Sequence, residues 1–117
     1  MTLILGAEAT VTGPTGADEA IPVDVTLAVA DTSEVLFTVP GGKRIRSFDL
    51  ANVSAGNNTD AHLSLTATVA ATTGDLVLRR REVLGQTGLD LAEGTYAFIG
   101  GAGDQPRVKG IVWVGPA

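Results

Sequence analysis

The chain has 117 residues, enough for one domain with a single hydrophobic core. Its net charge of -5 argues against a protein that binds the phosphate backbone of nucleic acid, because such a protein needs a basic face. It has no cysteine and one histidine, His62, which together exclude disulfides, thiolate metal sites and a histidine-rich metal site within one copy. No apolar run approaches the ~20 residues that a membrane-spanning helix needs.

Residues 1–20 differ from the rest of the chain, and we expect them to form an N-terminal arm or lead-in. A strand would be interrupted there at four positions, Gly6, Gly13, Pro14 and Gly16. The apolar patch Leu3, Ile4 and Leu5 either forms a first strand of the chain's own fold or packs on a neighbouring protein. No lysine or arginine precedes Lys43, so the basic region of a secretory signal is missing and we expect synthesis in a cytoplasm.

The next three segments alternate apolar and polar residues with a period of two, which is typical of strands with one buried face. Residues 22–30 place Val23, Val25, Leu27 and Val29 on one face, and residues 34–39 place Val35, Phe37 and Val39 on one face. A Pro-Gly-Gly turn then leads into a strand over residues 43–53. Its alternation slips by one residue between Ile45 and Phe48, and such a slip indicates a β-bulge.

The second half of the chain repeats this pattern. We expect strands at residues 61–69, 76–80, 95–99 and 108–114, a turn at residues 72–75, a break at residues 85–88, and a short strand containing Leu89 and Leu91. No window has a sustained helical period. The sequence therefore predicts an all-β protein, a single antiparallel β-sandwich of jelly-roll or Ig-like type over residues 21–117. The predicted core is Val25, Leu27, Phe37, Phe48, Leu50, Leu63, Leu65, Leu91, Phe98, Val112 and Val114.

Residues that could carry catalysis are scarce. His62 lies on the polar phase of its strand, where we expect it to face solvent or a neighbouring chain. Thirteen acidic residues make a carboxylate pair conceivable, but most of them fall at turns or strand ends, where acids shape turns. The glycine-rich run at residues 100–103 lacks the following Lys-Ser/Thr of a phosphate-binding loop. We expect no enzymatic activity, no metal and no cofactor.

The run Arg79, Arg80 and Arg81 is the one concentration of charge. On a strand, Arg79 and Arg81 would point to one face and Arg80 to the other. The run is either a solvated strand end or a contact with carboxylates of another subunit, which guanidinium groups bind well. Nucleic acid is disfavoured, because three arginines without interleaved aromatic residues on an acidic chain make a poor binding surface.

The run from Leu36 to Ser54, LFTVPGGKRIRSFDLANVS, resembles a pattern of tailed-bacteriophage virion proteins. In that pattern a T-V-P-x-G-K turn leads into a strand that ends in a short A/C-N-x-S motif. The strand at residues 62–69, the turn segment at residues 89–95 and the closing strand at residues 110–114 extend the resemblance over about residues 35–115. The resemblance implies no catalytic residue. It implies a head decoration (cement) protein, or a module of a tail, baseplate or fibre protein.

A single sandwich without heptad repeats favours capsid decoration among these roles, with a tail, baseplate or fibre component as the alternative. A carbohydrate-binding module is disfavoured, since only Trp113 and Tyr96 are candidates for stacking on a sugar. We expect a homotrimer in the virion, bound to the major capsid protein or other virion proteins and to neither nucleic acid nor membrane. The trimer follows from the local three-fold symmetry that the resemblance implies. The expected interface residues are Leu3, Ile4, Leu5, Arg79, Arg80 and Arg81.

Overall fold

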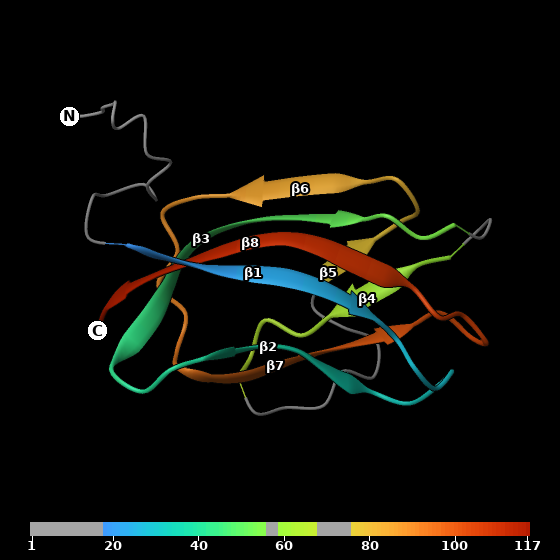
Figure 1. Ribbon diagram of the computed structural model, residues 1–117, viewed down its shortest axis with the longest axis horizontal. Helices are drawn as coiled ribbons and strands as arrows, with labels where there is room; N and C mark the ends of the chain where they lie inside the picture. The colour runs from blue at the N-terminus through green and yellow to red at the C-terminus, as the bar shows by residue number, and fades with distance from the viewer. Residues whose placement is uncertain (1–17, 56–58, 68–75) are drawn as a thin grey trace.

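Two four-stranded sheets pack face to face in the computed structural model, which describes residues 18–55, 59–67 and 76–117 (Figure 1). The strands are β1 (Glu19–Thr26), β2 (Glu34–Val39), β3 (Lys43–Asn52), β4 (Ala61–Leu63), β5 (Leu76–Leu78), β6 (Val83–Gln86), β7 (Gly94–Gly100) and β8 (Arg107–Pro116). Sheet 1 has the order β1-β8-β3-β6 and sheet 2 the order β2-β7-β4-β5, and all their pairings are antiparallel. The predicted antiparallel β-sandwich is confirmed. The described residues contain no helix, and so none able to span a membrane.

The N-terminal boundary falls slightly earlier than predicted. β1 begins at Glu19, inside the segment assigned to the arm, and ends at Thr26 rather than continuing to residue 30. Val29 therefore lies in the following loop and is 60% exposed, so its predicted place on the buried face is wrong. Leu3, Ile4 and Leu5, the predicted apolar anchors, lie outside the described residues.

The core lies between the sheets and is largely aliphatic. Of the predicted core residues, Leu27, Phe48, Leu50, Leu63, Phe98, Val112 and Val114 are buried, and Val25, Phe37, Leu65 and Leu91 pack on the core while only partly buried. The core also contains buried residues that the prediction omitted: Val23, Leu36, Val39, Ile45, Ala61, Leu78, Tyr96 and Val108. Burying each large apolar side chain stabilises the fold by about 1.5–3 kcal/mol.

Two bulges adjust which side chains face this core. The register of β3 against β8 shifts between Ile45 and Ser47, so the bulge predicted from the phase slip is confirmed. A second shift, in β2 against β7 between Val35 and Phe37, was not predicted. It turns Leu36 into the core at 4% exposure and leaves Val35 50% exposed, so the predicted phase of this strand is wrong at both positions.

The strands β4, β5 and β6 depart most from the sequence prediction. β4 and β5 have only three residues each, and the turn expected at residues 72–75 lies outside the described residues. Gly85, expected to break the chain, instead lies within β6 and pairs with Asp49 of β3. The chain turns after this strand, where Gly88 adopts a φ of 69°.

Ion pairs link β3 and β8 to neighbouring segments on the outside of the sandwich. Arg44 and Arg46 of β3 both donate to Asp90 Oδ1, in the connection between β6 and β7. Arg107 of β8 makes a two-bond contact with Asp24 of β1, at 2.8 Å for each bond. The hydrogen bond from Arg44 to Asp90, and that from Arg107 to Asp24, hold the pKa of each carboxyl below its ordinary value of 3.8.

We expect these pairs to make stability depend on acid pH. A carboxyl whose pKa is lower in the folded than in the unfolded state stabilises the fold above 3.8, and this stabilisation is lost as pH falls through the folded-state pKa. Asp90→Asn should therefore show a smaller fall in Tm than the unmodified chain between about pH 5 and about pH 2.5. Asp49→Asn, at an exposed carboxylate outside the described ion pairs, is the control. Equal falls for Asp90→Asn and the unmodified chain would contradict the expectation.

Candidate functional site

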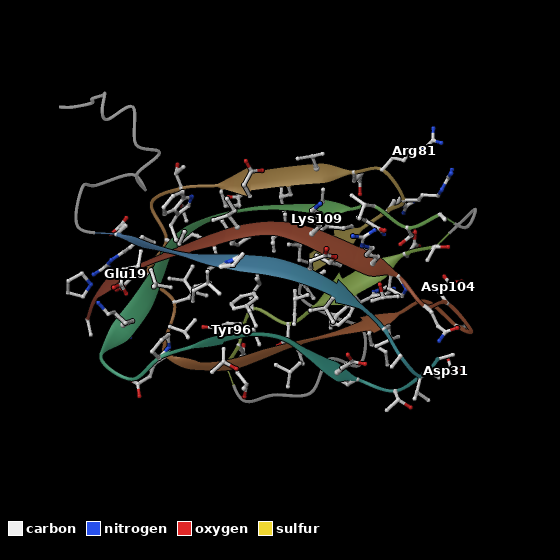
Figure 2. The ribbon with its side chains drawn as sticks, in the orientation of Figure 1. Glu19, Asp31, Arg81, Tyr96, Asp104 and Lys109 are labelled. Atoms are coloured by element: carbon white, nitrogen blue, oxygen red, sulfur yellow. The ribbon has the colours of Figure 1, made fainter. Side chains whose placement is uncertain are left out.

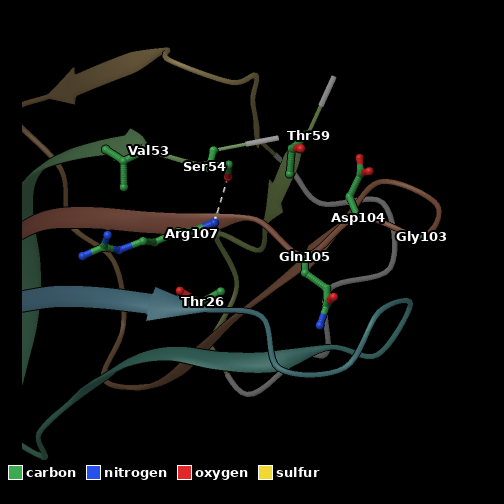
Figure 3. A pocket seen from close by; sticks show the side chains of 9 residues that line it. Thr26, Val53, Ser54, Thr59, Gly103, Asp104, Gln105 and Arg107 are labelled. Atoms are coloured by element: carbon green, nitrogen blue, oxygen red, sulfur yellow. Dashed lines mark hydrogen bonds between the residues drawn. The ribbon is translucent and has the colours of Figure 1, made fainter. Parts of the chain in front are cut away.

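One end of the sandwich is hollowed where the β1–β2, β3–β4 and β7–β8 connections meet (Figure 3). The cavity has a volume of about 430 Å³. Its lining is formed by Thr26, Val53, Ser54, Ala55, Thr59, Gly103, Asp104, Gln105 and Arg107. The β5–β6 turn borders the same end. We call this end, formed by residues 27–33, 53–55, 59–60, 79–82 and 101–106, the loop end.

Asn52, the last residue of β3, is a buried residue whose side chain links three segments at the loop end by hydrogen bonds. Its side chain is fully buried, and its amide donates to the carbonyls of Thr59 and Leu78, both at 2.8 Å. Its side-chain oxygen accepts from the backbone N–H and the hydroxyl of Ser54. Every hydrogen-bonding group of this buried amide therefore has a partner, which is what a stable buried polar group requires.

Ser54 extends the network to β8. Its hydroxyl accepts the backbone N–H of Arg107 at 2.9 Å, the contact drawn as a dashed line in Figure 3. The backbone of Asn52 also bonds the β5–β6 turn, accepting from Arg81 N–H at 2.8 Å and donating to the Glu82 carbonyl at 3.0 Å. The two sheets are thus joined at this end by hydrogen bonds as well as by the core.

The tips of the β1–β2 and β7–β8 loops are held against each other. Asp31 Oδ1 accepts from Gly103 N–H at 2.9 Å, and Gln105 Nε2 donates to the Ala28 carbonyl at 2.8 Å. Asp104 Oδ2 accepts from Asp60 N–H of the β3–β4 loop at 3.3 Å. Asp31 and Asp104 therefore bond backbone amides, and among the described residues neither forms an ion pair. We call Asp31 and Asp104 the acidic tips.

The arginine run forms the turn from β5 in sheet 2 to β6 in sheet 1, and we call Arg79–Arg81 the basic turn. Its predicted place on a strand is wrong, because β5 ends at Leu78. Glu82 Oε1 accepts from Arg79 N–H at 2.6 Å, and Arg80 Nε donates to the Ser54 carbonyl at 3.3 Å. Arg81 has a φ of 70°, in the left-handed region that favours glycine. The side chains of Arg79 and Arg81 are exposed.

The basic turn differs from the other arginines of the described chain in its lack of ion pairs. Arg44, Arg46 and Arg107 each bind an aspartate, whereas no guanidinium group of Arg79, Arg80 or Arg81 binds a carboxylate among the described residues. Figure 2 shows Arg81 and Asp31 at opposite sides of the loop end, with Asp104 between them. This end of the sandwich therefore presents separate positive and negative areas.

The other candidate residues do not join this site. His62 lies in β4, where it pairs with Val77 and Ile99. Its neighbours Ala61 and Leu63 are buried, whereas His62 is partly buried and lies on the outer face of sheet 2. Within the described ranges, no group of three or more histidine or acidic side chains is arranged to hold a metal ion. Hydroxyl, amide, carboxylate and guanidinium groups meet at the loop end, and this set of groups suits binding to a polar or charged surface.

Sequence reasoning missed the residues that organise the loop end. Asn52 shares the buried phase of Phe48 and Leu50, and a polar residue in a buried phase was the available signal. Nothing in the sequence pattern marks Asp31 and Asp104 as neighbours, because the fold brings together two loops that are far apart along the chain.

No family model matches the chain, and no curated protein or solved structure matches it either.

Proposed function

We propose that the protein is a non-enzymatic structural component of a tailed-bacteriophage particle, a decoration (cement) protein that binds the capsid in many copies as a homotrimer. The observation that carries the proposal is the phage-like pattern, whose span of about residues 35–115 covers β3 to β7 completely and most of β2 and β8. The T-V-P-x-G-K turn occupies the connection that carries the chain from sheet 2 to sheet 1. The residues that resemble the phage pattern thus include strands of both sheets.

The surface chemistry supports a protein that binds other proteins. No guanidinium group of the basic turn forms an ion pair among the described residues, so these groups can bind an external anionic group. Apolar side chains are also exposed on strands of both sheets, with Val35 at 50% and Val83 at 70%. Both belong to edge strands, β2 and β6, where contact with another subunit would cover unpaired backbone groups.

A tail, baseplate or fibre component is the alternative role, and the same surface chemistry is compatible with it. A carbohydrate-binding module has less support. Tyr96 is 1% exposed, stacks on Phe37 with ring centroids 5.0 Å apart, and donates its hydroxyl to the Ala92 carbonyl. It is therefore not available to a sugar, which leaves Trp113 of the two candidate aromatic residues.

The proposal is tested by co-sedimentation with particles of the phage whose genome encodes the chain. Purified protein is mixed separately with heads that lack it and with isolated tails. Saturable binding to heads is expected, in numbers that match the local three-fold positions of the shell. Binding to tails alone would replace decoration by the tail role, and binding to neither would contradict a virion role.

The role of residues 1–17 is tested in the same assay. Because β1 begins at Glu19, a chain starting at residue 18 keeps this strand whole and is a better truncation than one starting at residue 21. We expect weaker binding to heads for the shortened chain, through loss of Leu3, Ile4 and Leu5. Equal binding by the full and shortened chains would remove this apolar segment from the interface.

A further inference from the structure

We propose that the loop end is the contact between copies of this chain, with the basic turn Arg79–Arg81 of one copy bound to the acidic tips, Asp31 and Asp104, of the next. This inference rests on the homo-oligomer of the proposed function. It goes beyond that function by assigning both sides of the contact and the end of the sandwich at which it forms.

The first argument is the charge distribution. Three guanidinium groups follow one another in a short turn, and among the described residues none of them has a carboxylate partner. Neighbouring like charges repel, so the turn gains most from a partner that brings carboxylates. Aspartate side chains suit guanidinium groups because the two can form paired hydrogen bonds. The acidic tips offer two such carboxylates, which are likewise outside any described ion pair.

The second argument is the backbone of the basic turn. Arg81 adopts a φ of 70°, which glycine accepts without strain and most other residues avoid. Its side chain is exposed and forms no described ion pair that would offset this strain. A glycine would serve the turn equally well. The arginine side chain therefore points to a role outside the folded monomer.

The third argument is geometry. Arg81 and Asp31 lie at opposite sides of one end of the molecule, and Asp104 lies between them (Figure 2). A copy can then present its basic turn to one neighbour and its acidic tips to the other. Such a head-to-tail contact closes into a ring when the rotation between copies fits, and three copies give the proposed trimer.

Both surfaces are ordered before any contact forms. Hydrogen bonds with the backbones of Asn52 and Ser54 hold the basic turn. Hydrogen bonds donated by the backbones of Gly103 and Asp60 hold the acidic tips. Each aspartate of the acidic tips accepts one backbone N–H through a single carboxylate oxygen. The carboxylate has further lone pairs that can accept from a guanidinium group. Little backbone ordering entropy is therefore lost on association, which favours binding at these turns.

The test measures molar mass by analytical ultracentrifugation across a range of protein concentration and salt. The unmodified chain is expected to form a trimer whose dissociation constant rises at least about tenfold between low and high salt. Arg79→Glu/Arg81→Glu is expected to be monomeric at concentrations where the unmodified chain is trimeric. Lys109→Glu, a cation of β8 outside the loop end, is the matched control and should keep the trimer.

Two further variants separate assembly from folding. Arg81→Gly removes the side chain at the strained position, so we expect an unchanged or higher Tm together with about tenfold weaker assembly. Asp31→Lys/Asp104→Lys is expected to be monomeric alone and to form mixed oligomers with Arg79→Glu/Arg81→Glu. Restoration of assembly by two variants that each fail alone would identify the two surfaces as partners.

A monomeric unmodified chain, or an Arg79→Glu/Arg81→Glu variant that keeps the trimer mass, would overturn the inference. If that variant stays trimeric but no longer binds heads, the basic turn faces the shell, so the inference fails while the proposed function stands. If the trimer behaves as expected but binds neither heads nor tails, the inference stands and the virion role fails.

Discussion

Replacing Asn52 with alanine is expected to lower the free energy of unfolding by about 3–5 kcal/mol, among the largest losses available in this chain. The truncation leaves the carbonyls of Thr59 and Leu78, and the N–H and hydroxyl of Ser54, without their described partner in a buried place. Each buried polar group left unsatisfied costs about 1–3 kcal/mol. Urea denaturation gives the loss directly, and a value below about 1 kcal/mol would contradict the role assigned to this amide.

Asn52→Asp separates the hydrogen bonds of this side chain from its volume. Aspartate has the same shape, but at neutral pH it cannot donate to the two carbonyls and it buries a charge. We expect a loss at least as large as that of alanine, reduced at acid pH when compared with the unmodified chain at the same pH, because a protonated carboxyl regains one donor. Ser54→Ala, which removes the acceptor of Arg107 N–H, is the milder reference at about 1–2 kcal/mol.

Gly110→Ala is the second change from which we expect a large effect, a loss of about 2–4 kcal/mol. A Cβ at this position of β8 would lie 2.0 Å from the Asp49 carbonyl oxygen and 2.9 Å from Leu50 Cα. Both atoms belong to the backbone of β3, which is paired on its other side with β6. The strand cannot move away without loosening its hydrogen bonds to one neighbour or the other.

Gly85→Ala is the matched control, because Gly85 lies across from Asp49 on the opposite side of β3. A Cβ there would be 3.7 Å from Asp49 Oδ1, an ordinary contact. We expect no loss, or a gain of about 0.4–1 kcal/mol from the smaller entropy of the unfolded chain. Thermal and urea denaturation of both variants provide the comparison. Equal losses would show that the close approach at Gly110 is not the cause.

The fold could be predicted wherever a strand has one clearly buried face. In β1, Val23 and Val25 alternate with Asp24 and Thr26. In β3, the slip between Ile45 and Phe48 marked the bulge that the pairing with β8 shows. The buried face of β2 was harder to predict, because Val35, Leu36 and Phe37 are all apolar and either phase would bury hydrophobic side chains. Pairing with β7 decides the phase there, and this information is not local to the strand.

The loop end was less predictable because side chains there bond backbone groups that would otherwise pair with a neighbouring strand. A strand through residues 76–80 was a reasonable expectation, but Glu82 takes the N–H of Arg79 and Asn52 takes the carbonyl of Leu78. The chain turns instead, and the three arginines form the connection between β5 and β6. Such an outcome depends on a residue 26 positions away along the chain, and periodicity carries no such information.

The central position of β8 has a consequence for how the protein folds. β8 lies between β1 and β3, and it brings residue 114 against residue 19. Until β8 has been synthesised and inserted, β1 lacks its partner in sheet 1 and β3 exposes one unpaired edge. Contacts between such distant residues form slowly, so we expect refolding in milliseconds to seconds, followed by the fluorescence of Trp113 on β8. During synthesis, these open edges make the incomplete chain prone to aggregate, so a slower rate of expression should raise the soluble yield.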